Sequence, residues 1–572
     1  MEHIIDIAKG DQPADILLKN VRLVNVFTGE VFRTNVALAG DWIAGIGENY
    51  LEGHEILDLD GLFLLPGFID GHLHLESTLL HPAEYARLAL PRGTTTVILD
   101  PHEIANILGL AGIHALMDAS QDLPLDFFFM APSCVPATDL ETAGASLSPG
   151  DVAKLLRDER VLGLGEMMNF PGVLHKDPEV LAKIQSARKK GKWIDGHAPL
   201  LSGKALNAYI VPGIESDHEC TKREELEEKL RLGMWGMIRE GTGAKNLRDL
   251  LPAVTPKNSR RCLLVLDDLD PGTLFHQGDI DHVLRRAVSL GLDPVTAVQM
   301  VTLNPAERYG LRDRGAIAPG RMADLAVVED LKNFQVHITF KNGTVVAREG
   351  KAYPLLRDEF DPKNSRTVRI KPLDASSFRL PLATEKAWVI GLIPDQLLTR
   401  KLSLPVKKGS QGEAVSDSEA DILKIAVLER HRASGNIGLG LVQGVGLKKG
   451  ALGSTIAHDS HNAVIVGTND ADMKKAADEI IKMQGGLVVV DGQEVKASLP
   501  LPVAGVISPE PAETIVSRMD ALHRAAREIG CSLPHPFLAL SFLALPVIPE
   551  LKLTDKGLVD VARFQVVPIE SS

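Results

Sequence analysis

The chain has 572 residues, a hydrophobic fraction of 45% and a formal net charge of −13. Its length predicts more than one domain, and its apolar content excludes a globally disordered protein. The negative charge argues against nucleic acid or an anionic membrane as the main partner, because both favour basic patches. The 4 cysteines are far apart and form no CxxC pair, which speaks against a disulfide framework and against a thiolate zinc site.

Neither the N-terminus nor the hydropathy pattern indicates a membrane or secretory segment. The first residues, MEHIIDIAKGDQPAD, lack the basic segment and apolar core of a signal peptide. No uncharged apolar run reaches the length of about 18 residues that a membrane span needs. We therefore expect a cytoplasmic protein.

Two short segments with β-strand patterns lie on either side of a longer segment with a different pattern. Residues 15–60 show strand-like alternation broken by Gly, Asn and Asp turns, and a similar pattern returns after about residue 313, with a hairpin signal at Asn342-Gly343. Each segment is too short to bury much surface alone. We predict that residues 1–62 and 313–370 form one discontinuous β-sandwich, with another domain inserted between them.

Residues 63–312 alternate apolar runs with stretches of helical periodicity. Continuous apolar runs are typical of strands buried on both faces of a parallel sheet. Eight such strand–helix units in about 250 residues fit a (β/α)8 barrel of the TIM type. A doubly wound sheet is the alternative, but no Gly-rich phosphate loop follows the first run. We therefore predict an α/β fold with a catalytic barrel.

The last part of the chain predicts a further domain. Residues 357–385 are charged and show little periodicity, which is typical of a connector. Residues 386–572 return to an α/β pattern and are long enough for a core of their own. Their segment GLGLVQGVG does not fit GxGxxG, so we interpret it as a tightly packed strand rather than a dinucleotide-binding loop.

Polar residues gather where the predicted barrel strands end. His72 and His74 are two residues apart, so in a strand both imidazoles point to the same side. Barrel enzymes place their chemistry at the carboxyl ends of the strands, and charged groups are rarely buried unless paired or metal-bound. The candidates are His72, His74 and Glu76; Asp100, His102 and Glu103; Glu166; Asp195 and His197; Asp217, His218 and Glu219; Asp267 and Asp268. For His102, Asp195 and Asp217 taken singly, a purely structural role stays open.

These motifs resemble those of the amidohydrolase superfamily and, within it, of the adenine deaminase family. The resemblance covers essentially the whole chain, including the C-terminal region that other amidohydrolases lack. It implies hydrolytic deamination of adenine to hypoxanthine and ammonia in purine salvage, by a homodimer or a larger homo-oligomer. The segments that carry it are PGFIDGHLHLES, TTTVILDPHEIAN, GLGEMMNFPGV, IDGHAP, SDHE, LDDLDP, GAIAPGRMADLAVV and AHDSHN.

The resemblance also implies two divalent metal ions that activate a hydroxide. Manganese is favoured, while iron and zinc remain open, because mixed imidazole and carboxylate ligation suits all three. The implied ligands are His72, His74 and Asp267 for one ion, His197 and His218 for the other, and Glu166 as the bridge between them.

In this mechanism Asp267 carries a proton from the hydroxide to the leaving ammonia. A second group must protonate the ring, and the residue that does so in cytosine-type deaminases corresponds here to Leu200. Glu76, Glu103 and Glu219 are the remaining carboxylates, and we favour Glu103.

The other polar residues are predicted to surround the substrate. Asp100 and His102 would position Glu103 or the base, and Asp268 would contact the substrate or exchange roles with Asp267. We expect His458, Asp459 and His461 of AHDSHN to cover the barrel mouth and contact the purine; a surface loop without a role is the alternative.

Three other functions remain open. The substrate could be another aminopurine or a pterin, or a cyclic amide, although enzymes acting on cyclic amides typically have lysine at the position of Glu166. The chain could also be a metal-binding protein without catalytic activity, which the intact ligand set disfavours.

Overall fold

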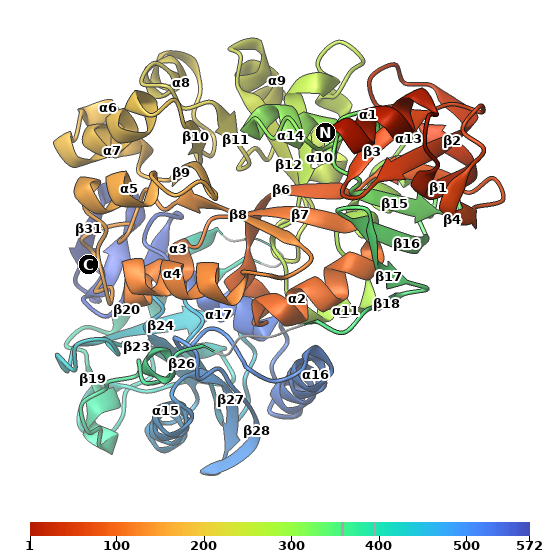
Figure 1. Cartoon of the computed structure of the whole chain (residues 1–572). Helices are drawn as coiled ribbons and strands as arrows, with labels where there is room; N and C mark the ends of the chain where they lie inside the picture. The colour runs from red at the N-terminus through yellow and green to blue at the C-terminus, as the bar shows by residue number, and fades with distance from the viewer. Residues whose placement is uncertain (356–359, 394–395, 397, 572) are drawn as a thin grey trace.

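The computed structural model describes residues 1–355, 360–393, 396 and 398–571. Residues 356–359, 394–395, 397 and 572, which fall in the predicted sandwich and C-terminal domain, lie outside the described residues. Figure 1 shows three parts: a sheet that joins the red N-terminal strands to green ones, a central orange-to-green α/β part, and a cyan-to-blue C-terminal part.

One sheet combines strands from before and after the central part, in the order β18-β17-β16-β15-β5-β1-β2-β3, with β4 paired to β1. Its buried core draws on both segments, for example Leu23, Val36, Leu325 and Phe340. The helix α1 (Glu2–Lys9) precedes it. The strands are β1 (Ala14–Val24), β2 (Val31–Ala39), β3 (Trp42–Ile46), β4 (Gly53–Asp58), β5 (Phe63–Pro66), β15 (Leu325–Val328), β16 (Val336–Lys341), β17 (Thr344–Arg348) and β18 (Lys351–Ala352).

The strand β5 corrects one detail of the sequence analysis, which placed it in the first barrel strand. It pairs with β1 and β15 in the N-terminal sheet, and the barrel strand begins only at Phe68. The chain changes sheets at Pro66-Gly67, where proline lacks an amide hydrogen to continue the ladder. A Cβ on Gly67 would lie 2.3 Å from the Thr95 hydroxyl, so only glycine fits there.

The central part contains parallel strands that curl around a common interior. They form two hydrogen-bonded sheets, ordered β10-β9-β8-β7-β6-β14 and β11-β12-β13. The two sheets are joined through β13 and β14, which are separated by only one residue, Leu266. Apolar side chains from several of them, including Ile69, Ile98, Met237 and Val265, form one buried cluster. The strands are β6 (Phe68–His74), β7 (Thr94–Leu99), β8 (Asp126–Ala131), β9 (Val161–Met167), β10 (Trp193–Gly196), β11 (Ser216–Asp217), β12 (Trp235–Arg239), β13 (Cys262–Val265) and β14 (Asp267–Asp268).

Helices follow these strands as the periodicity predicts. Several begin at side-chain caps; Ser148 and Asp151, for example, form a reciprocal capping box. The helices are α2 (Pro82–Ala89), α3 (His102–Leu108), α4 (Leu110–Ala119), α5 (Pro149–Leu155), α6 (Phe170–His175), α7 (Pro178–Lys189), α8 (Gly203–Ile210), α9 (Arg223–Arg231), α10 (Leu247–Leu250), α11 (Pro271–His276), α12 (Ile280–Ser289), α13 (Pro294–Met300) and α14 (Leu303–Tyr309).

The C-terminal part has its own sheet, ordered β21-β20-β24-β23-β26-β25-β27-β28, and a smaller one, β29-β30-β31. Its helices are α15 (Asp470–Met483), α16 (Ala512–Glu528) and α17 (Pro536–Leu543). The strands are β20 (Lys386–Leu392), β21 (Thr399–Pro405), β23 (Ile422–Leu428), β24 (Ile437–Gln443), β25 (Ala451–Ser454), β26 (Ala463–Gly467), β27 (Gly486–Asp491), β28 (Glu494–Pro500), β29 (Leu551–Thr554), β30 (Gly557–Asp560) and β31 (Gln565–Val567), with the short pair β19 (Leu380–Pro381) and β22 (Glu413–Ala414) beside them.

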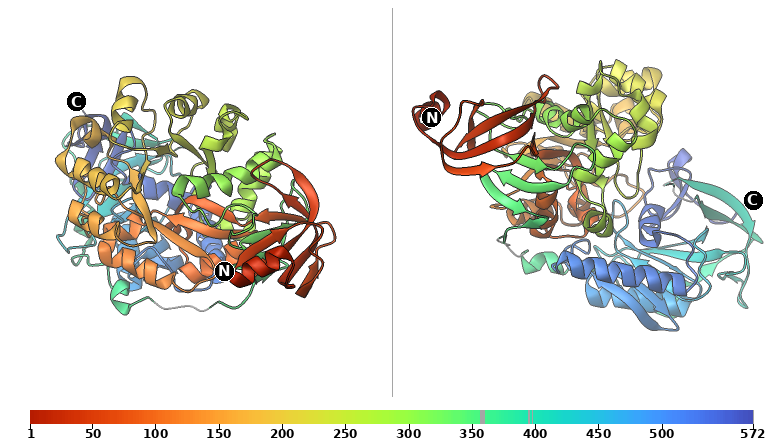
Figure 2. Two further views of the ribbon diagram at one scale, coloured as in Figure 1. Left: turned by 45° about the horizontal axis from the view of Figure 1, so that its top comes forward. Right: turned by 90° about the vertical axis from the view of Figure 1, so that its right-hand side faces the viewer.

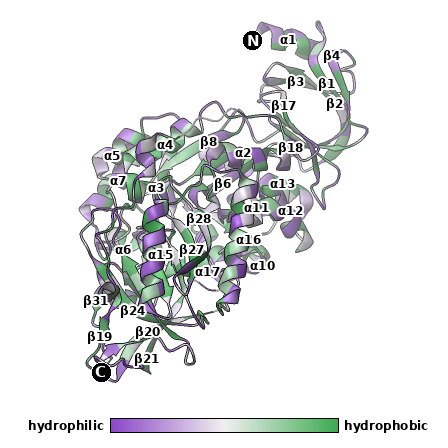
Figure 3. Cartoon of the chain, turned by 90° about the horizontal axis from the view of Figure 1, so that it is seen from below, coloured by the Kyte–Doolittle hydropathy of each residue, from purple (hydrophilic) through white to green (hydrophobic). Residues whose placement is uncertain are grey.

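The Gly-rich segment GLGLVQGVG begins in β24, so its interpretation as a packed strand is confirmed. A Cβ on Gly438 would lie 1.8 Å from the Thr554 carbonyl oxygen. The helices α15 and α16 cover opposite faces of the sheet: α15 shares a core with Val488 and Val490, whereas α16 belongs to the cluster that joins the sheet to the central part. In Figure 3 both carry hydrophilic as well as hydrophobic residues. Among the described residues, none of the helices combines the length and the apolarity needed to cross a membrane.

The C-terminal part packs against the central part (Figure 2, right). The Ser508 amide donates to the Leu79 carbonyl at 2.9 Å, and Asp555 accepts from the Thr142 amide at 2.8 Å. Apolar residues of both parts belong to one buried cluster. Side chains from the C-terminal part can therefore reach the ends of the central strands.

Candidate active site

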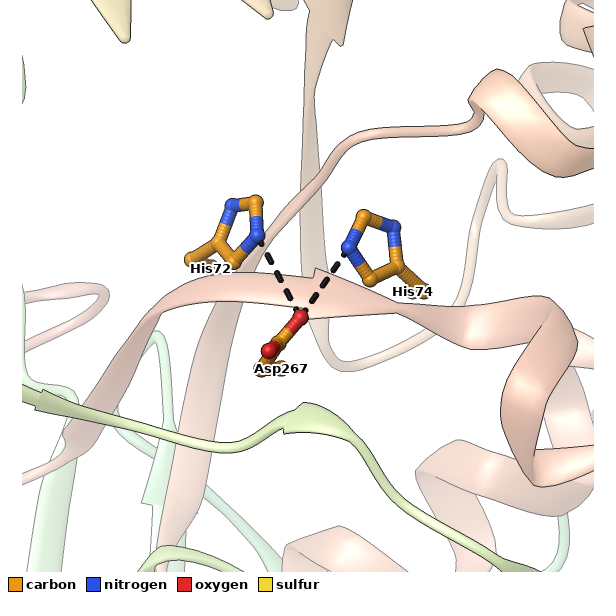
Figure 4. Close-up of side chains that lie close together, drawn as sticks. All are labelled: His72, His74 and Asp267. Atoms are coloured by element: carbon orange, nitrogen blue, oxygen red, sulfur yellow. Dashed lines mark ion pairs between the residues drawn. The ribbon is translucent and has the colours of Figure 1, made fainter. Parts of the chain in front are cut away.

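The six predicted metal ligands lie together at one end of the curled sheet. Asp267 Oδ1 lies 3.1 Å from His74 Nε2 and 3.6 Å from His72 Nε2 (Figure 4). Glu166 lies between this group and a second one: its Oε1 is 3.4 Å from His74 Nε2, and its Oε2 is 3.0 Å from His218 Nε2. The Nδ1 of His197 contacts the same Oε2.

The backbone explains this convergence. His72 and His74 occupy alternate positions of β6, and Asp268 of β14 lies opposite His74 in the parallel ladder. Glu166 is near the end of β9, while His197 and His218 directly follow β10 and β11. Each side chain thus comes from the carboxyl end of a parallel strand, where such folds assemble active sites.

The side chains fit divalent metal ions. The Nδ1 of His74 lies 3.0 Å from the Asp100 carbonyl oxygen, and with its ring proton donated there Nε2 would be free to bind an ion beside Asp267 and Glu166. The buried Nε2 of His72 has no hydrogen-bond partner among the described residues. His72, His74 and Asp267 form one group that could hold an ion, and His72, Glu166 and His218 form another. Unpaired imidazole nitrogens facing carboxylates are typical of metal sites.

Both carboxylates are held in the ionised form that ligation requires. Burial by itself would raise the pKa of Glu166, but His218 and His197 hold it well below its usual range. Burial opposes ionisation of Asp267 too, and there Arg239 and the histidines of β6 lower the pKa.

The predicted second group of residues lies beside the ligands. The His102 ring lies between Glu166 and Glu103, at 3.3 Å from a carboxylate oxygen of each. Asp100 accepts a hydrogen bond from the Glu166 amide at 2.8 Å, so it fixes the backbone there. Glu76 is fully buried and accepts from the Ile104 amide at 3.0 Å; burial raises its pKa to about 7.

Of the other residues predicted from the sequence, some line the cavity and others are hydrogen-bonded behind it. Asp268, Glu219, His458 and Asp459 line a cavity together with five of the predicted ligands, all except His72, whereas His461 lies behind Glu103. Asp268 accepts a hydrogen bond from Ser77. Two carboxylates have structural partners: Asp195 is bound by Arg308 at 2.8 Å and Tyr309 at 2.9 Å, and Asp217 accepts from the Ala198 and Glu219 amides, both at 2.8 Å.

Sequence reasoning missed Arg239, at the end of β12. Its guanidinium donates to Asp267 Oδ2 at 2.7 Å and binds Glu219 through two nitrogens. The bidentate contact with Glu219 fixes the guanidinium, and its single hydrogen bond to Asp267 Oδ2 leaves Oδ1 of Asp267 facing the histidines. The signal was present in the sequence, since Arg239 ends the apolar run WGMIR of residues 235–239, as the other candidates end their own apolar runs.

Sequence reasoning also missed an apolar wall of the cavity. Phe542, Leu545, Val547 and Ile548 line it from the C-terminal part, and Met168 from the central part. The Phe542 ring stacks on His458 with ring centroids 4.6 Å apart. No local pattern could reveal this wall, because it forms only when two distant parts of the chain pack together.

We expect Arg239→Met to lower the free energy of unfolding by about 3 kcal/mol, because it leaves two buried carboxylates without their cation. Urea unfolding of the metal-free protein measures this change. Arg239→Lys keeps the charge but loses the bidentate geometry, so it is expected to cost less. A methionine variant as stable as the parent protein would contradict the assigned pairing.

One family model agrees with this geometry. Residues 63–346 match the family described as "Amidohydrolase family". A curled parallel sheet with histidines and carboxylates at its carboxyl end is typical of this class of protein. Among solved structures, a β-aspartyl dipeptidase from Fervidobacterium islandicum aligns with a TM-score of 0.45 at 17% identity, over 60% of this chain and 99% of that one.

The C-terminal part and the full-length relatives identify the family within this class of protein. Residues 396–565 match "Adenine deaminase C-terminal domain". An adenine deaminase from Dehalococcoides mccartyi is 48% identical over 571 residues, covering 100% of this chain and 99% of the relative. One from Desulfatibacillum aliphaticivorans is 49% identical over 568 residues, covering 99% of both chains. The chain belongs to the adenine deaminase family.

Proposed function

We propose that this protein hydrolyses adenine to hypoxanthine and ammonia, in purine salvage. The observation that carries the proposal is the cavity in which five of the six predicted metal ligands, Glu103 and an apolar wall meet, with the sixth, His72, grouped with His74 and Asp267. The full-length relatives named adenine deaminase support it.

We propose two divalent ions, with manganese favoured. His72, His74 and Asp267 would hold one, His197 and His218 the other, and Glu166 both, because its two oxygens face the two groups. The ions supply an activated water nucleophile when bound. The remaining chemistry falls to the side chains of the cavity.

Water adds to C6 of adenine, and the C6–N bond breaks as ammonia leaves. Asp267 moves a proton from the attacking water to the departing amino group. Burial opposes ionisation of Glu103, but His458 and the other imidazoles hold its pKa well below its usual range. Glu103 therefore passes a proton from a protonated imidazole to ring N1, so that the tetrahedral intermediate carries no uncompensated charge, and the second proton of the water replaces it. The apolar wall suits a flat heteroaromatic base and excludes water from the carboxylates.

We also propose a more detailed assignment of the domains. We interpret the curled sheet as a (β/α)8 barrel within residues 63–312, with its first strand beginning at Phe68. The two hydrogen-bonded sheets support this, as does the Glu215 amide, which donates to the Ile194 carbonyl at 3.1 Å where β10 and β11 approach. The sandwich of residues 1–62 and 313–370, the domain of residues 386–572, the homo-oligomeric state and the cytoplasmic location stay predictions.

A substrate panel tests the function. The purified protein is stripped of metal, reloaded with manganese and assayed with adenine, adenosine, guanine and dihydroorotate. We expect the ultraviolet change of adenine to hypoxanthine, with adenine turned over far faster than the other three. Preferred hydrolysis of dihydroorotate would indicate a cyclic amidase, and preferred turnover of adenosine or guanine another aminopurine enzyme.

A further inference from the structure

The loop AHDSHN of the C-terminal part lies directly against Glu103 of the central part. His458 contacts one carboxylate oxygen of Glu103 and His461 the other. We propose that these two histidines hold Glu103 in its working orientation, so that the C-terminal part completes the catalytic site. Both are positioning residues that act through Glu103, a role that differs from the purine contact expected from the sequence.

The hydrogen bonds of His461 define its role. Its Nδ1 accepts a hydrogen bond from the Ala457 amide at 3.2 Å, so the ring proton must lie on Nε2. That Nε2–H donates to Glu103 Oε2. A histidine with this proton arrangement offers no lone pair to a metal at Nε2, although Glu103, His458 and His461 lie close enough to form a ligand group. The cluster is therefore a hydrogen-bonded support rather than a further metal site.

His458 provides the second contact from a different direction. Its Nδ1 faces Glu103 Oε1, and its ring lies against Phe542. His102 approaches the same Oε1 at 3.3 Å from the central part. Glu103 is thus surrounded by imidazoles, and both of its oxygens are assigned, which leaves the carboxylate a single orientation.

The loop that carries the two histidines is itself fixed. The buried Arg430 guanidinium donates to the His461 carbonyl and, at 3.0 Å, to the Ala504 carbonyl. The Nε2 of His431 donates to the Ser460 carbonyl at 2.7 Å. Asn462 donates across to the Thr142 carbonyl of the central part at 2.9 Å. Such anchoring gives the loop the rigidity that positioning a proton donor requires.

His102 connects this histidine–carboxylate cluster to the predicted metal ligands. His102 lies 3.3 Å from an oxygen of both Glu103 and Glu166, so the C-terminal histidines connect to the metal ligands through two side chains. His461 does not line the cavity, whereas His458 does. An effect of replacing His461 on turnover must therefore pass through Glu103.

The inference rests on the proposed function and is tested first by kinetics. We expect His461→Leu to lower kcat for adenine by about tenfold to a hundredfold, a range typical of lost supporting hydrogen bonds. KM and metal content should stay nearly unchanged, because His461 contacts neither the cavity nor a ligand. His461→Gln places an amide donor near the Nε2 position and should restore most of the activity. The matched control is His523→Leu, in the same part of the chain but away from Glu103, which should behave like the parent protein.

Double-variant cycles separate positioning from general damage. In a Glu103→Gln background, His461→Leu should cause no further loss of kcat, because its target is already altered. The same four proteins compared by thermal unfolding should show non-additive shifts in Tm, a readout that needs no activity. Additive Tm shifts, or full activity of His461→Leu in a protein that deaminates adenine, would overturn the inference. A parent protein that leaves adenine unchanged would instead refute the proposed function, and the Tm cycle would still decide the inference.

Discussion

Asp267→Asn is expected to lower kcat for adenine by about a thousandfold, because it removes the group that carries a proton from water to the leaving amino group. The substitution keeps the size of the side chain and one oxygen in place, so the fold should tolerate it. Asp267 Oδ1 lies 3.1 Å from His74 Nε2, and its other oxygen is bound by Arg239. Steady-state kinetics with metal analysis of the same sample measures the effect.

The neighbouring residue provides the control. Asp268 also lines the cavity, but it accepts a hydrogen bond from Ser77 and belongs to neither ligand group. Asp268→Asn should therefore lose much less activity than Asp267→Asn. The opposite order would show that the two aspartates have exchanged roles, the alternative that the sequence left open.

Glu166→Gln is expected to reduce the metal content from two ions per chain towards one and to lower kcat by about a hundredfold. A carboxylate whose oxygens face two ligand groups binds an ion with each, whereas an amide offers only one neutral oxygen. Metal analysis after reloading with manganese and extensive dialysis measures the occupancy.

Glu219→Gln is the matched control for this change. Its carboxylate lies 3.6 Å from His218 Nε2 and could form a group with His197 and His218, but both of its oxygens are bound by Arg239, so it does not bridge the two groups. Its metal content should stay near that of the parent protein. Unchanged two-ion occupancy in Glu166→Gln would refute the bridging role of Glu166.

The sequence could reveal the candidate ligands because each lies at the end of a strand, or directly after one, that is itself visible as an apolar run. The period of two in a strand places His72 and His74 on one side, and parallel strands bring Glu166, His197 and His218 to the same end. The structure brings these residues together as that logic expects. Local patterns are sufficient wherever strand geometry alone sets the direction of a side chain.

Contacts between distant segments could not be predicted in this way. The transfer of β5 to the N-terminal sheet depends on partners more than 250 residues away, in β15. The pairing of Arg239 with Asp267 depends on the spacing of neighbouring strands. The contact of His461 with Glu103 depends on how the C-terminal part packs, and no periodicity carries that information.

Glu103 illustrates what the structure adds. The sequence offered three carboxylates for ring protonation. Glu219 is paired with Arg239, and Glu76 is bound to a backbone amide of α3, whereas Glu103 lines the cavity and is held by imidazoles. Burial opposes its ionisation, but the imidazoles hold the pKa of Glu103 well below its usual range, so this carboxylate suits the passing of a proton from an imidazole to a ring nitrogen.

The most direct test of the account is to titrate the metal-free protein with manganese while following the formation of hypoxanthine from adenine. The account predicts that activity rises with added metal and reaches its plateau at two equivalents per chain. A plateau at one equivalent would contradict the two-ion centre, and the absence of hypoxanthine at every metal loading would contradict adenine deamination itself.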